Sequence, residues 1–310
     1  MRITLLFLLL LFGIFSFSEL KGDFIRAYTL DGTLREEGWL DNGQKTGVWT
    51  SYYLDGSILD RGNYLNNLKD SLWKNFYNTG EISTQGYYQK GKREGFWAKY
   101  TQQGVITEIG EYQNNKKNGF WWFYSPLSTL QDSIPLKKGY FLDNEPVGFW
   151  HFYYENGQIK RKGEFLNNKL NGYWKYYFDN GDVLKEGRFK EGKKEGVWRE
   201  YYYRGGISER GTYIKGKKNL VWEFYHRNGK LSSRGVFEND EAKGHWMFFD
   251  EKGILVEEGK IKNREREGFW RHYDGGLLCC EGPYDKGRKT GLWKLFDKNG
   301  KIKRLVKDAH

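Results

Sequence analysis

The sequence is poor in the residues that organise several common protein classes. Among 310 residues there are two cysteines, four prolines and two methionines. Two cysteines are too few for a disulfide-stapled scaffold or a cysteine-rich zinc protein. After residue 17 no apolar run is long enough to span a membrane, and no segment shows the apolar periodicity and caps of an amphipathic helix. These absences point away from disulfide-rich, zinc-ribbon and helical classes.

Aromatic residues and glycine are abundant instead. Phe, Trp and Tyr make up 18% of the chain, and there are 40 glycines. Such an aromatic content is the opposite of a disordered composition, and the glycine content is far below the one third of a collagen. The net charge of +11 favours acidic partners electrostatically.

The first eighteen residues predict an export signal. Arg2 supplies a positive start, residues 3–17 are almost entirely apolar, and Ser16-Phe17-Ser18 offers a cleavage site with small residues. The apolar stretch is shorter than the ~20 residues of a membrane-spanning helix. We therefore expect cleavage after Ser18, no transmembrane segment in the remaining chain, and a periplasmic, cell-surface or secreted protein. Export disfavours nucleic acid as a partner.

Nearly all of the remaining chain is one repeat of about 24 residues. Its anchors are eleven tryptophans at almost constant spacing: Trp49, Trp73, Trp97, Trp121, Trp150, Trp174, Trp198, Trp222, Trp246, Trp270 and Trp293. Each is followed three residues later by Tyr or Phe, and in the regular units thirteen residues later by Gly. Such self-similarity is typical of solenoid-like arrays, in which each unit contacts only its neighbours. We place the array at 19–302, with about eleven units, and a C-terminal tail at 303–310.

Each unit is predicted to be a β-hairpin. Aromatic and β-branched residues form two short runs, and the turn between them is often Asn-Gly or Asp-Gly, as at Asp55-Gly56 and Asn156-Gly157. That dipeptide favours a two-residue type I′ turn, which would place each Trp opposite the Gly thirteen residues later, with the indole over that glycine. We therefore expect an all-β fold in which tandem 24-residue hairpins form one long twisted antiparallel sheet.

These residues resemble a known family of repeats. The pattern of Gly95, Trp97, Tyr100, Gly110 and Tyr112 is similar to the variant MORN repeat of bacteria, which also builds proteins grouped as YwqK-type antitoxins. The resemblance covers about nine tenths of the chain. It implies a β-hairpin array used for protein or lipid contact, and it brings no enzymatic residues with it.

The chain departs from the family pattern at two places. Ser71 and Leu220 replace the glycine that stands two residues before the tryptophan in the other full units. In addition, an export signal fits poorly with a cytoplasmic antitoxin.

Two irregularities are candidates for function. Five extra residues fall between Trp121 and Trp150, near 125–137, where they either form a binding loop, bend the array or are a tolerated insertion. The seven-residue second turns, such as 41–47 and 65–71, carry an excess of basic residues. Recurring pairs predict a basic edge: Lys92, Arg93, Lys116, Lys117, Lys193, Lys194, Lys217, Lys218, Arg288 and Lys289. Such an edge would attract anionic lipid, polysaccharide or acidic protein, or would simply be solvated.

Catalytic, cofactor and metal sites are not predicted. The five histidines fall at different positions of the repeat, and the sequence has no phosphate-binding glycine loop, nucleophile elbow or His-Glu-x-x-His motif. Cys279 and Cys280 are adjacent, so their side chains would face opposite sides of a strand, and we expect a buried pair of thiols rather than a disulfide.

The sequence therefore predicts an exported, non-enzymatic repeat scaffold that binds a protein partner through an aromatic and polar sheet surface. Two alternatives stay open. One is an antitoxin or immunity-like protein that neutralises a toxin. The other is a binder of anionic lipid or cell-surface polysaccharide through the basic turns.

Overall fold

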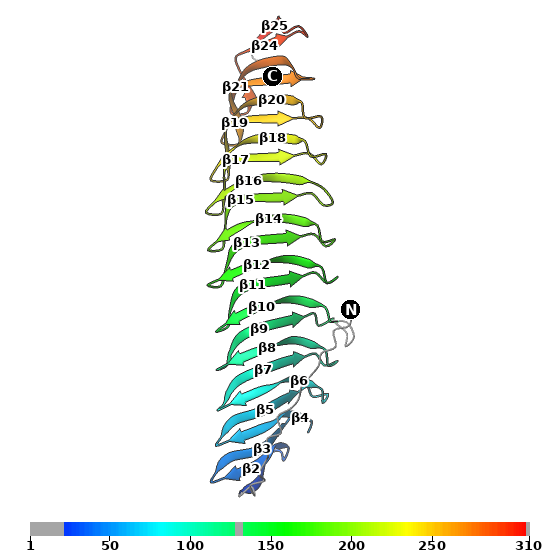
Figure 1. The fold of residues 1–310 in the computed structure, drawn as a ribbon, viewed down its shortest axis with the longest axis vertical. Helices are drawn as coiled ribbons and strands as arrows, with labels where there is room; N and C mark the ends of the chain where they lie inside the picture. The colour runs from blue at the N-terminus through cyan, green and yellow to red at the C-terminus, as the bar shows by residue number, and fades with distance from the viewer. Residues whose placement is uncertain (1–21, 128–132, 308–310) are drawn as a thin grey trace. The chain divides into compact units, whose positions relative to one another are not determined.

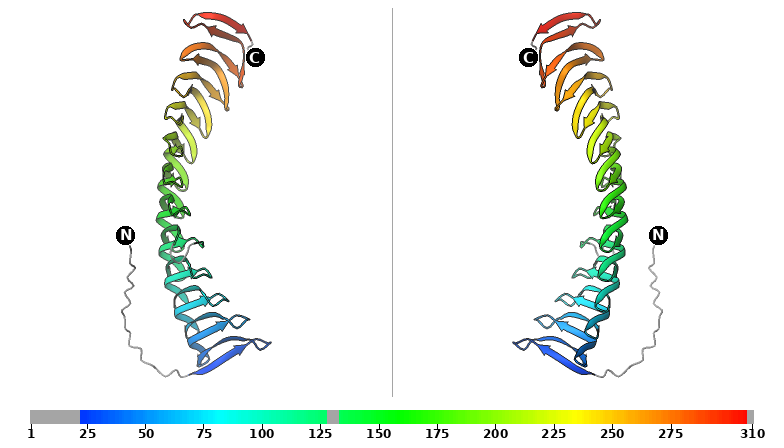
Figure 2. Two further views of the ribbon diagram at one scale, coloured as in Figure 1. Left: turned by 90° about the vertical axis from the view of Figure 1, so that its right-hand side faces the viewer. Right: turned by 90° about the vertical axis from the view of Figure 1, so that its left-hand side faces the viewer.

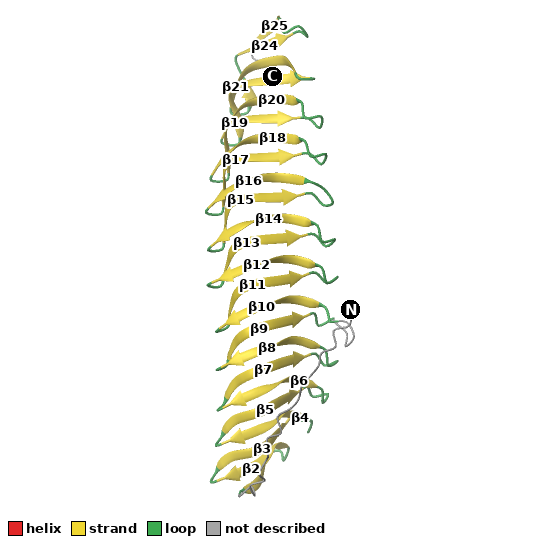
Figure 3. Ribbon diagram, viewed as in Figure 1, coloured by secondary structure: helices red, strands yellow, loops and turns green. Residues whose placement is uncertain are grey.

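The computed structural model describes residues 22–127 and 133–307. Every regular element in these ranges is a β-strand, as the colouring of Figure 3 shows. The same ranges hold no helix that is long and apolar enough to cross a membrane. The predicted export signal, residues 1–18, lies outside the described residues.

The described part of the chain divides into two compact units between Lys92 and Arg93, at the first residue of β7, which is counted with the second unit. The first unit contains β1 (Asp23–Tyr28), β2 (Leu34–Asp41), β3 (Gln44–Tyr52), β4 (Ile58–Leu65), β5 (Leu68–Phe76) and β6 (Ile82–Gln89). The second unit contains β7 (Lys92–Tyr100), β8 (Ile106–Gln113), β9 (Lys116–Tyr124), β10 (Pro135–Leu142), β11 (Glu145–Tyr153), β12 (Ile159–Leu166), β13 (Lys169–Tyr177), β14 (Val183–Lys190), β15 (Lys193–Tyr201), β16 (Ile207–Ile214), β17 (Lys217–Tyr225), β18 (Leu231–Glu238), β19 (Glu241–Phe249), β20 (Leu255–Lys262), β21 (Glu265–Asp274), β22 (Leu277–Asp285), β23 (Arg288–Lys289), β24 (Leu292–Phe296) and β25 (Ile302–Lys307).

Within each unit, consecutive strands pair with one another and every pairing is antiparallel (Figure 1). The one variation is near the C-terminal end, where β22 pairs with both β23 and β24. In the second unit the described strands form a single layer, with no second sheet stacked on them (Figure 2). The predicted all-β fold of tandem antiparallel hairpins is confirmed.

The register of the hairpins also follows the sequence. Trp150 pairs with Gly163, and Trp198 pairs with Gly211, so each of these tryptophans lies opposite the glycine thirteen residues later, as predicted. A register shift follows three residues after the tryptophan, for example between Phe152 and Tyr153. This bulge ends the regular pairing at the hairpin loop.

The type I′ prediction for the Asn-Gly and Asp-Gly turns is wrong. In the loop after β3, the Tyr53 N–H donates to the Ser57 carbonyl (2.8 Å) and the Gly56 N–H donates to the Tyr53 carbonyl (3.1 Å). Only Gly56 has a positive φ, of 84°. This is a three-residue loop, a type I turn closed by a left-handed glycine. The Asp55 carboxylate accepts the Ser57 N–H (2.9 Å), which holds Asp55 in a right-handed conformation.

The type I′ turns are found instead at the second, polar turns. Between β4 and β5, Asn66 and Asn67 have φ values of 49° and 65° and form a two-residue connection. All the remaining residues of the predicted seven-residue turn 65–71 are strand residues. The second turns are therefore much tighter than the sequence predicted, and the basic pairs lie at the start of strands rather than within turns.

A bulge two residues before each tryptophan explains the glycine at that position. In β17, Thr212 pairs with Asn219 and Gly211 pairs with Trp222, so Leu220 and Val221 are extra residues on one side of the pairing. The first of them is left-handed, with a φ of 61° at Leu220 and 59° at Ser71. Glycine adopts this conformation without steric cost, whereas leucine is strained in it.

The predicted insertion and the predicted C-terminal tail both differ in extent from the loops of the structure. The insertion near 125–137 lies between β9 and β10, but residues 128–132 are outside the described ranges and residues 135–137 belong to β10. The loop is closed where the Ser125 N–H donates to the Ile134 carbonyl (2.9 Å). The predicted C-terminal tail begins too early, because residues 303–307 belong to β25, which pairs with β24 and completes the last hairpin.

Candidate functional site

The two faces of the hairpins differ in what they expose. Alternate side chains of a strand point to opposite faces. We call the face that carries the eleven tryptophans the tryptophan face. The open face is formed by the residues directly before and after each tryptophan, by the aromatic residue three positions after it, and by their partners on the neighbouring strand.

The buried core of the protein is formed by the side chains of the tryptophan face. Each of the eleven tryptophans is at most 5% exposed. The ring of Trp198 lies across Gly187, where a methyl group would be 2.3 Å from the indole. This glycine stands eleven residues before the tryptophan, so the predicted glycine thirteen residues later is the pairing partner but does not lie under the ring. The aromatic rings of Phe189 and Tyr213 pack edge-on against Trp198 on either side.

The indole N–H completes this arrangement. The bulge before Trp198 leaves the Arg188 carbonyl without a pairing partner in the ladder, and the Trp198 Nε1–H donates to it (3.0 Å). The same contact recurs in other units, for example from Trp174 to the Glu164 carbonyl (3.0 Å). A tryptophan is therefore needed both for its apolar area and for its single donor.

The second residue of each predicted basic pair belongs to this face and not to an edge. The Lys218 ammonium lies 4.0 Å from the centre of the Trp222 ring and 3.0 Å from the Glu209 carboxylate. Arg93, Lys117, Lys194 and Lys289 lie over their tryptophans in the same way. The predicted basic edge thus keeps only its first members, Lys92, Lys116, Lys193, Lys217 and Arg288, which are exposed where the strands begin. The cause is the alternation of side chains along a strand.

In each compact unit, taken by itself, the open face carries a column of exposed apolar side chains. It is made by the residue directly before each tryptophan, which is apolar in ten of eleven units and histidine in one. Nine members are between 40% and 63% exposed: Val48, Leu72, Phe96, Phe149, Tyr173, Val197, Val221, Phe269 and Leu292. Isolated exposed apolar residues are common on protein surfaces, but a regular column of them is typical of an interaction site.

Beside this column runs a ladder of charged side chains. In the second unit, Glu186 lies between Lys175 (3.0 Å) and Arg199 (4.0 Å). Further along, Glu223 lies between Arg210 and Arg234 in the same way, and Glu281 lies between Arg271 and Lys294. Glu258 contacts Arg271 on the next strand and His245 diagonally on the previous one. Each basic residue of the ladder from Lys175 to Lys294 therefore contacts a carboxylate.

The tyrosines three residues after the tryptophans support the carboxylates of the ladder. The hydroxyl groups of Tyr201, Tyr225 and Tyr273 donate to Glu186 (2.9 Å), Glu223 (2.9 Å) and Glu258 (2.7 Å). Burial and the Glu258 carboxylate raise the pKa of Tyr273 to about 12. Burial acts to raise the pKa of Glu186, but hydrogen bonds from Lys175, Tyr173 and Tyr201 outweigh it and lower that pKa. These carboxylates are ionised and held in place at neutral pH.

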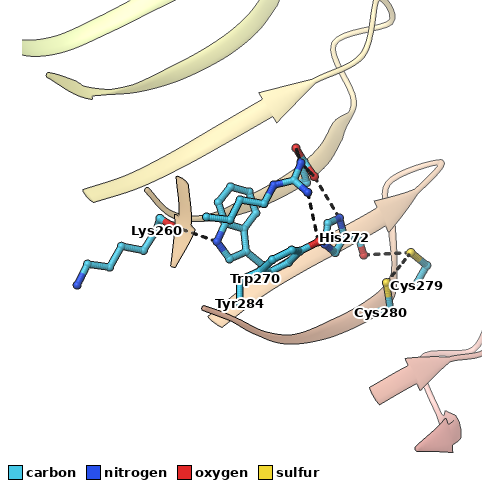
Figure 4. Close-up of polar contacts among 8 residues, drawn as sticks. Lys260, Trp270, His272, Cys279, Cys280 and Tyr284 are labelled. Carbon is cyan, nitrogen blue, oxygen red and sulfur yellow. Dashed lines mark hydrogen bonds and ion pairs between the residues drawn. The ribbon is translucent and has the colours of Figure 1, made fainter. Parts of the chain in front are cut away.

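A compact polar cluster around His272 was missed by the sequence analysis. His272 occupies the place where most neighbouring units have a large apolar side chain two residues after the tryptophan. Its Nδ1 lies 3.2 Å from Glu257, and its Nε2 lies 3.4 Å from the Tyr284 hydroxyl (Figure 4). Arg266 makes a bidentate contact to Glu257 and a hydrogen bond to Tyr284 (3.2 Å). Hydrogen bonding to His272 is the main cause that lowers the pKa of Glu257.

The two cysteines lie next to this cluster. They are free thiols with the two sulfurs 3.7 Å apart, and Cys279 Sγ donates to the His272 carbonyl (Figure 4). Both are half-buried rather than fully buried, and Cys280 packs against Trp270 and Trp293. Burial raises the pKa of Cys280 to about 11, so this thiol is protonated and is not an activated nucleophile. The polar groups of the cluster form hydrogen bonds and ion pairs with one another, as is typical of a structural site.

The metal-ligating residue types do not come together among the described residues. Within residues 22–127 and 133–307, no group of three or more His, Cys, Asp or Glu side chains is arranged to hold a metal ion. The histidines are dispersed over the array, with His151 and His245 on the open face and His272 on the tryptophan face.

Comparison with known families identifies the repeat. The family described as the MORN repeat variant matches residues 45–66, 150–167, 170–191, 218–239 and 289–306. Together these segments are about a third of the chain. The chain thus contains five recognisable variant MORN repeats, which confirms that part of the predicted resemblance, whereas the narrower likeness to YwqK-type antitoxins is not supported by this match. No curated protein matches the chain.

Among solved structures, two matches cover most of this chain at low identity and low TM-score. The pore of the Photorhabdus luminescens Tc holotoxin is 12% identical over 91% of this chain and 18% of that chain, with a TM-score of 0.18. A crystal structure of TcdB2-TccC3 is 13% identical over 93% of this chain and 21% of that chain, with a TM-score of 0.17. The chain spans about a fifth of the length of these structures.

Proposed function

We propose that the chain is an exported, non-enzymatic repeat scaffold that binds a protein partner through its open face. The observation that carries the proposal is the column of apolar side chains, 40–63% exposed, on a face that no other described layer of the chain covers. Exposed apolar surface is costly in water, and a repeated row of it is typical of a surface that a partner covers.

The composition of the open face supports a protein as the partner. Aromatic residues and arginine are enriched at protein interfaces, and the open face combines them: Phe149 and Phe269 in the apolar column, tyrosines beside it, and Arg199, Arg210 and Arg271 in the ladder. The tyrosine hydroxyls and the ladder carboxylates are already held by hydrogen bonds. A partner would therefore bind a surface whose polar side chains are ordered beforehand, which lowers the entropy cost of association.

The alternative of an anionic surface as the partner has less support. It relied on a continuous basic edge, but the second residue of each pair lies over a tryptophan, and several of these also contact a carboxylate. The antitoxin alternative is a special case of the proposal, in which the protein partner is a toxin.

The proposal is tested by affinity capture with a matched pair of variants. The purified chain is used to capture proteins from an envelope extract of its own cells, and bound proteins are quantified by mass spectrometry. F149S/F269S removes two large side chains from the apolar column, whereas L54S/L127S removes two exposed apolar side chains from loops.

A partner that binds the open face should be captured about tenfold less by F149S/F269S and equally by L54S/L127S, because interface aromatics contribute strongly when buried. Equal capture by both variants would show that the apolar column is not the binding surface. Urea unfolding of each variant controls for loss of the fold.

Export is tested separately by the mass of the protein in cell fractions. Cleavage after Ser18 gives a chain that begins at Glu19, in the periplasm, on the cell surface or in the medium. An uncleaved chain in the cytoplasm would remove export from the proposal and would favour the antitoxin alternative.

A further inference from the structure

In the second unit, the charge ladder of the open face begins with a basic stretch that has no carboxylate. Lys138, His151, Lys162 and Lys175 are consecutive cross-strand neighbours from β10 to β13, and we call these four residues the cationic strip. From Lys175 to Lys294 each basic residue of the ladder contacts a carboxylate, the first of which is Glu186 on β14. Before the strip, its neighbour on β9 is Trp122.

The strip has little internal charge compensation. Lys175 contacts Glu186 (3.0 Å), but neither Lys138 nor Lys162 has an ion pair within 4.0 Å among the described residues. Glu164 is on the same face, two residues along β12 from Lys162, and it too makes no ion pair in the described part of the chain. Lys162 lies directly opposite Lys175, and like charges at directly opposed positions of an antiparallel sheet are destabilising, so this pairing costs stability. Burial, followed by Lys138 and Lys162, lowers the pKa of His151.

Aromatic rings hold the strip in place without neutralising it. The Lys138 ammonium lies 4.1 Å from the centre of the Trp122 ring and 5.7 Å from that of Tyr153. Lys162 lies 5.7 Å from the Tyr177 ring, and the His151 ring stacks on Tyr153. A cation over a ring is attracted by the ring quadrupole but keeps its full charge, so it remains available to an anion.

We propose that the cationic strip is the docking site for an acidic, extended segment of the protein partner. The inference rests on the proposed function, because it assigns the chemistry of one part of the same open face. Its basis is charge complementarity. In the second unit the basic ladder residues from Lys175 to Lys294 each contact a carboxylate, whereas Lys138 and Lys162 contact none, and an anionic ligand would compensate these charges.

The spacing of the strip suits a polypeptide. Adjacent strands are about 4.8 Å apart, so the three steps from Lys138 to Lys175 span roughly 14 Å. An extended chain that crosses the strands places alternate side chains about 6.7 Å apart, so three acidic residues at alternate positions span roughly 13 Å. The exposed rings of Tyr140, Phe149 and Tyr173 border the strip and offer apolar contacts to the same segment, which a phosphate-rich membrane surface would not use as well.

The test measures binding of defined probes to the full purified chain. The first probe is a fluorescein-labelled peptide of alternating glutamate and threonine, measured by fluorescence anisotropy, with the glutamine counterpart as its control. The second probe is vesicles of phosphatidylglycerol and phosphatidylcholine, measured by co-sedimentation. K138E/K162E reverses the charge of the strip, and K252E/K298E makes the same change of net charge at exposed loop positions.

The expected result is that the acidic peptide binds the wild-type chain and K252E/K298E equally, and K138E/K162E at least about tenfold more weakly, with no binding of the glutamine peptide. Equal weakening by both variants would show a non-specific charge effect and overturn the inference. Vesicle binding that depends on Lys138 and Lys162, without peptide binding, would overturn it in favour of a lipid surface.

Failure of the acidic docking site can be distinguished from failure of the proposed function. A partner whose capture needs Phe149 and Phe269 but is unchanged in K138E/K162E would leave the scaffold function intact and remove only the acidic docking site. The urea unfolding midpoints of the four double variants, compared with that of the wild-type chain, confirm that each variant is folded before its binding is interpreted.

Discussion

The tryptophan face and the open face are built on the same strands but follow different rules. On the tryptophan face the same contacts recur along the array: an indole across a glycine and, in most units, an N–H to the carbonyl freed by the bulge and a cation over the ring. On the open face the corresponding positions change from unit to unit, from Phe149 to Val197 to His245. Repetition is the sign of a shared structural task, and variation on an equally regular frame shows where a specific surface can be built.

The largest expected difference between the faces is in stability. Trp198→Ala removes a fully buried indole with its hydrogen bond and should lower the free energy of unfolding by about 3–5 kcal/mol. Val197→Ala, one residue away on the open face, should cost less than about 1 kcal/mol, because Val197 is 52% exposed. Urea unfolding followed by tryptophan fluorescence and circular dichroism measures both. Similar losses for the two variants would contradict the assignment of the core to one face.

A smaller but sharper effect is expected at the glycine beneath the ring. Gly187→Ala would place a methyl group 2.3 Å from the Trp198 ring, so the indole must move, at a cost of about 1–3 kcal/mol. Gly206 is a matched control, because a methyl group there meets no atom within 4 Å. Gly206→Ala should leave the urea midpoint unchanged or raise it slightly, since alanine reduces the entropy of the unfolded chain. If Gly187→Ala left the free energy of unfolding unchanged, the Trp198 ring would not require a glycine beneath it.

The strained bulge positions predict a stabilising change. Leu220 is left-handed and 56% exposed, so its side chain gains little from burial while its backbone is strained. Leu220→Gly should raise the free energy of unfolding by about 1 kcal/mol, because a left-handed residue with a Cβ costs 1–2 kcal/mol. The reverse change, Gly196→Leu at the equivalent place one unit earlier, should lower it by a similar amount. A destabilised Leu220→Gly would show that the leucine makes contacts worth more than its strain.

The sequence predicts the repeat, the hairpins and the pairing of each tryptophan with the glycine thirteen residues later, because these depend on regular spacing. It misassigns the turns, because Asn-Gly and Asp-Gly fit two turn types. The choice depends on local hydrogen bonds such as that from the Ser57 N–H to Asp55, which spacing does not reveal. It also misplaces the second residue of each basic pair, because a cation near the start of a strand can lie either at the edge of the sheet or over an aromatic ring.

The cationic strip could not be predicted for a different reason. Its members lie on four strands, and whether Lys138 is paired with a carboxylate depends on which residue of the next strand lies directly opposite it. A shift of one residue in the register would move that whole strand's side chains to the other face. Only the observed register, with His151 opposite both Lys138 and Lys162, shows that the carboxylates of the ladder are missing there.

The smallest expected effect is on the pH dependence of stability, and it separates the ladder from exposed charges. Glu186 is held as a carboxylate by Lys175 and Tyr201, and its pKa in the folded chain is below the ordinary value of 4.5. A carboxyl group with a lowered pKa contributes stability above its unfolded pKa, and this contribution is lost as the pH falls through the folded pKa.

Glu186→Gln should therefore be less stable than the wild-type chain at pH 7, and the difference should shrink as the pH falls below about 4.5. Glu155→Gln, on an exposed hairpin loop, is the control and should follow the wild-type curve at every pH. Urea midpoints measured from pH 7 to pH 3 give the comparison. A constant difference across that range would mean that Glu186 acts through packing alone, and that the ladder is not held together by charge.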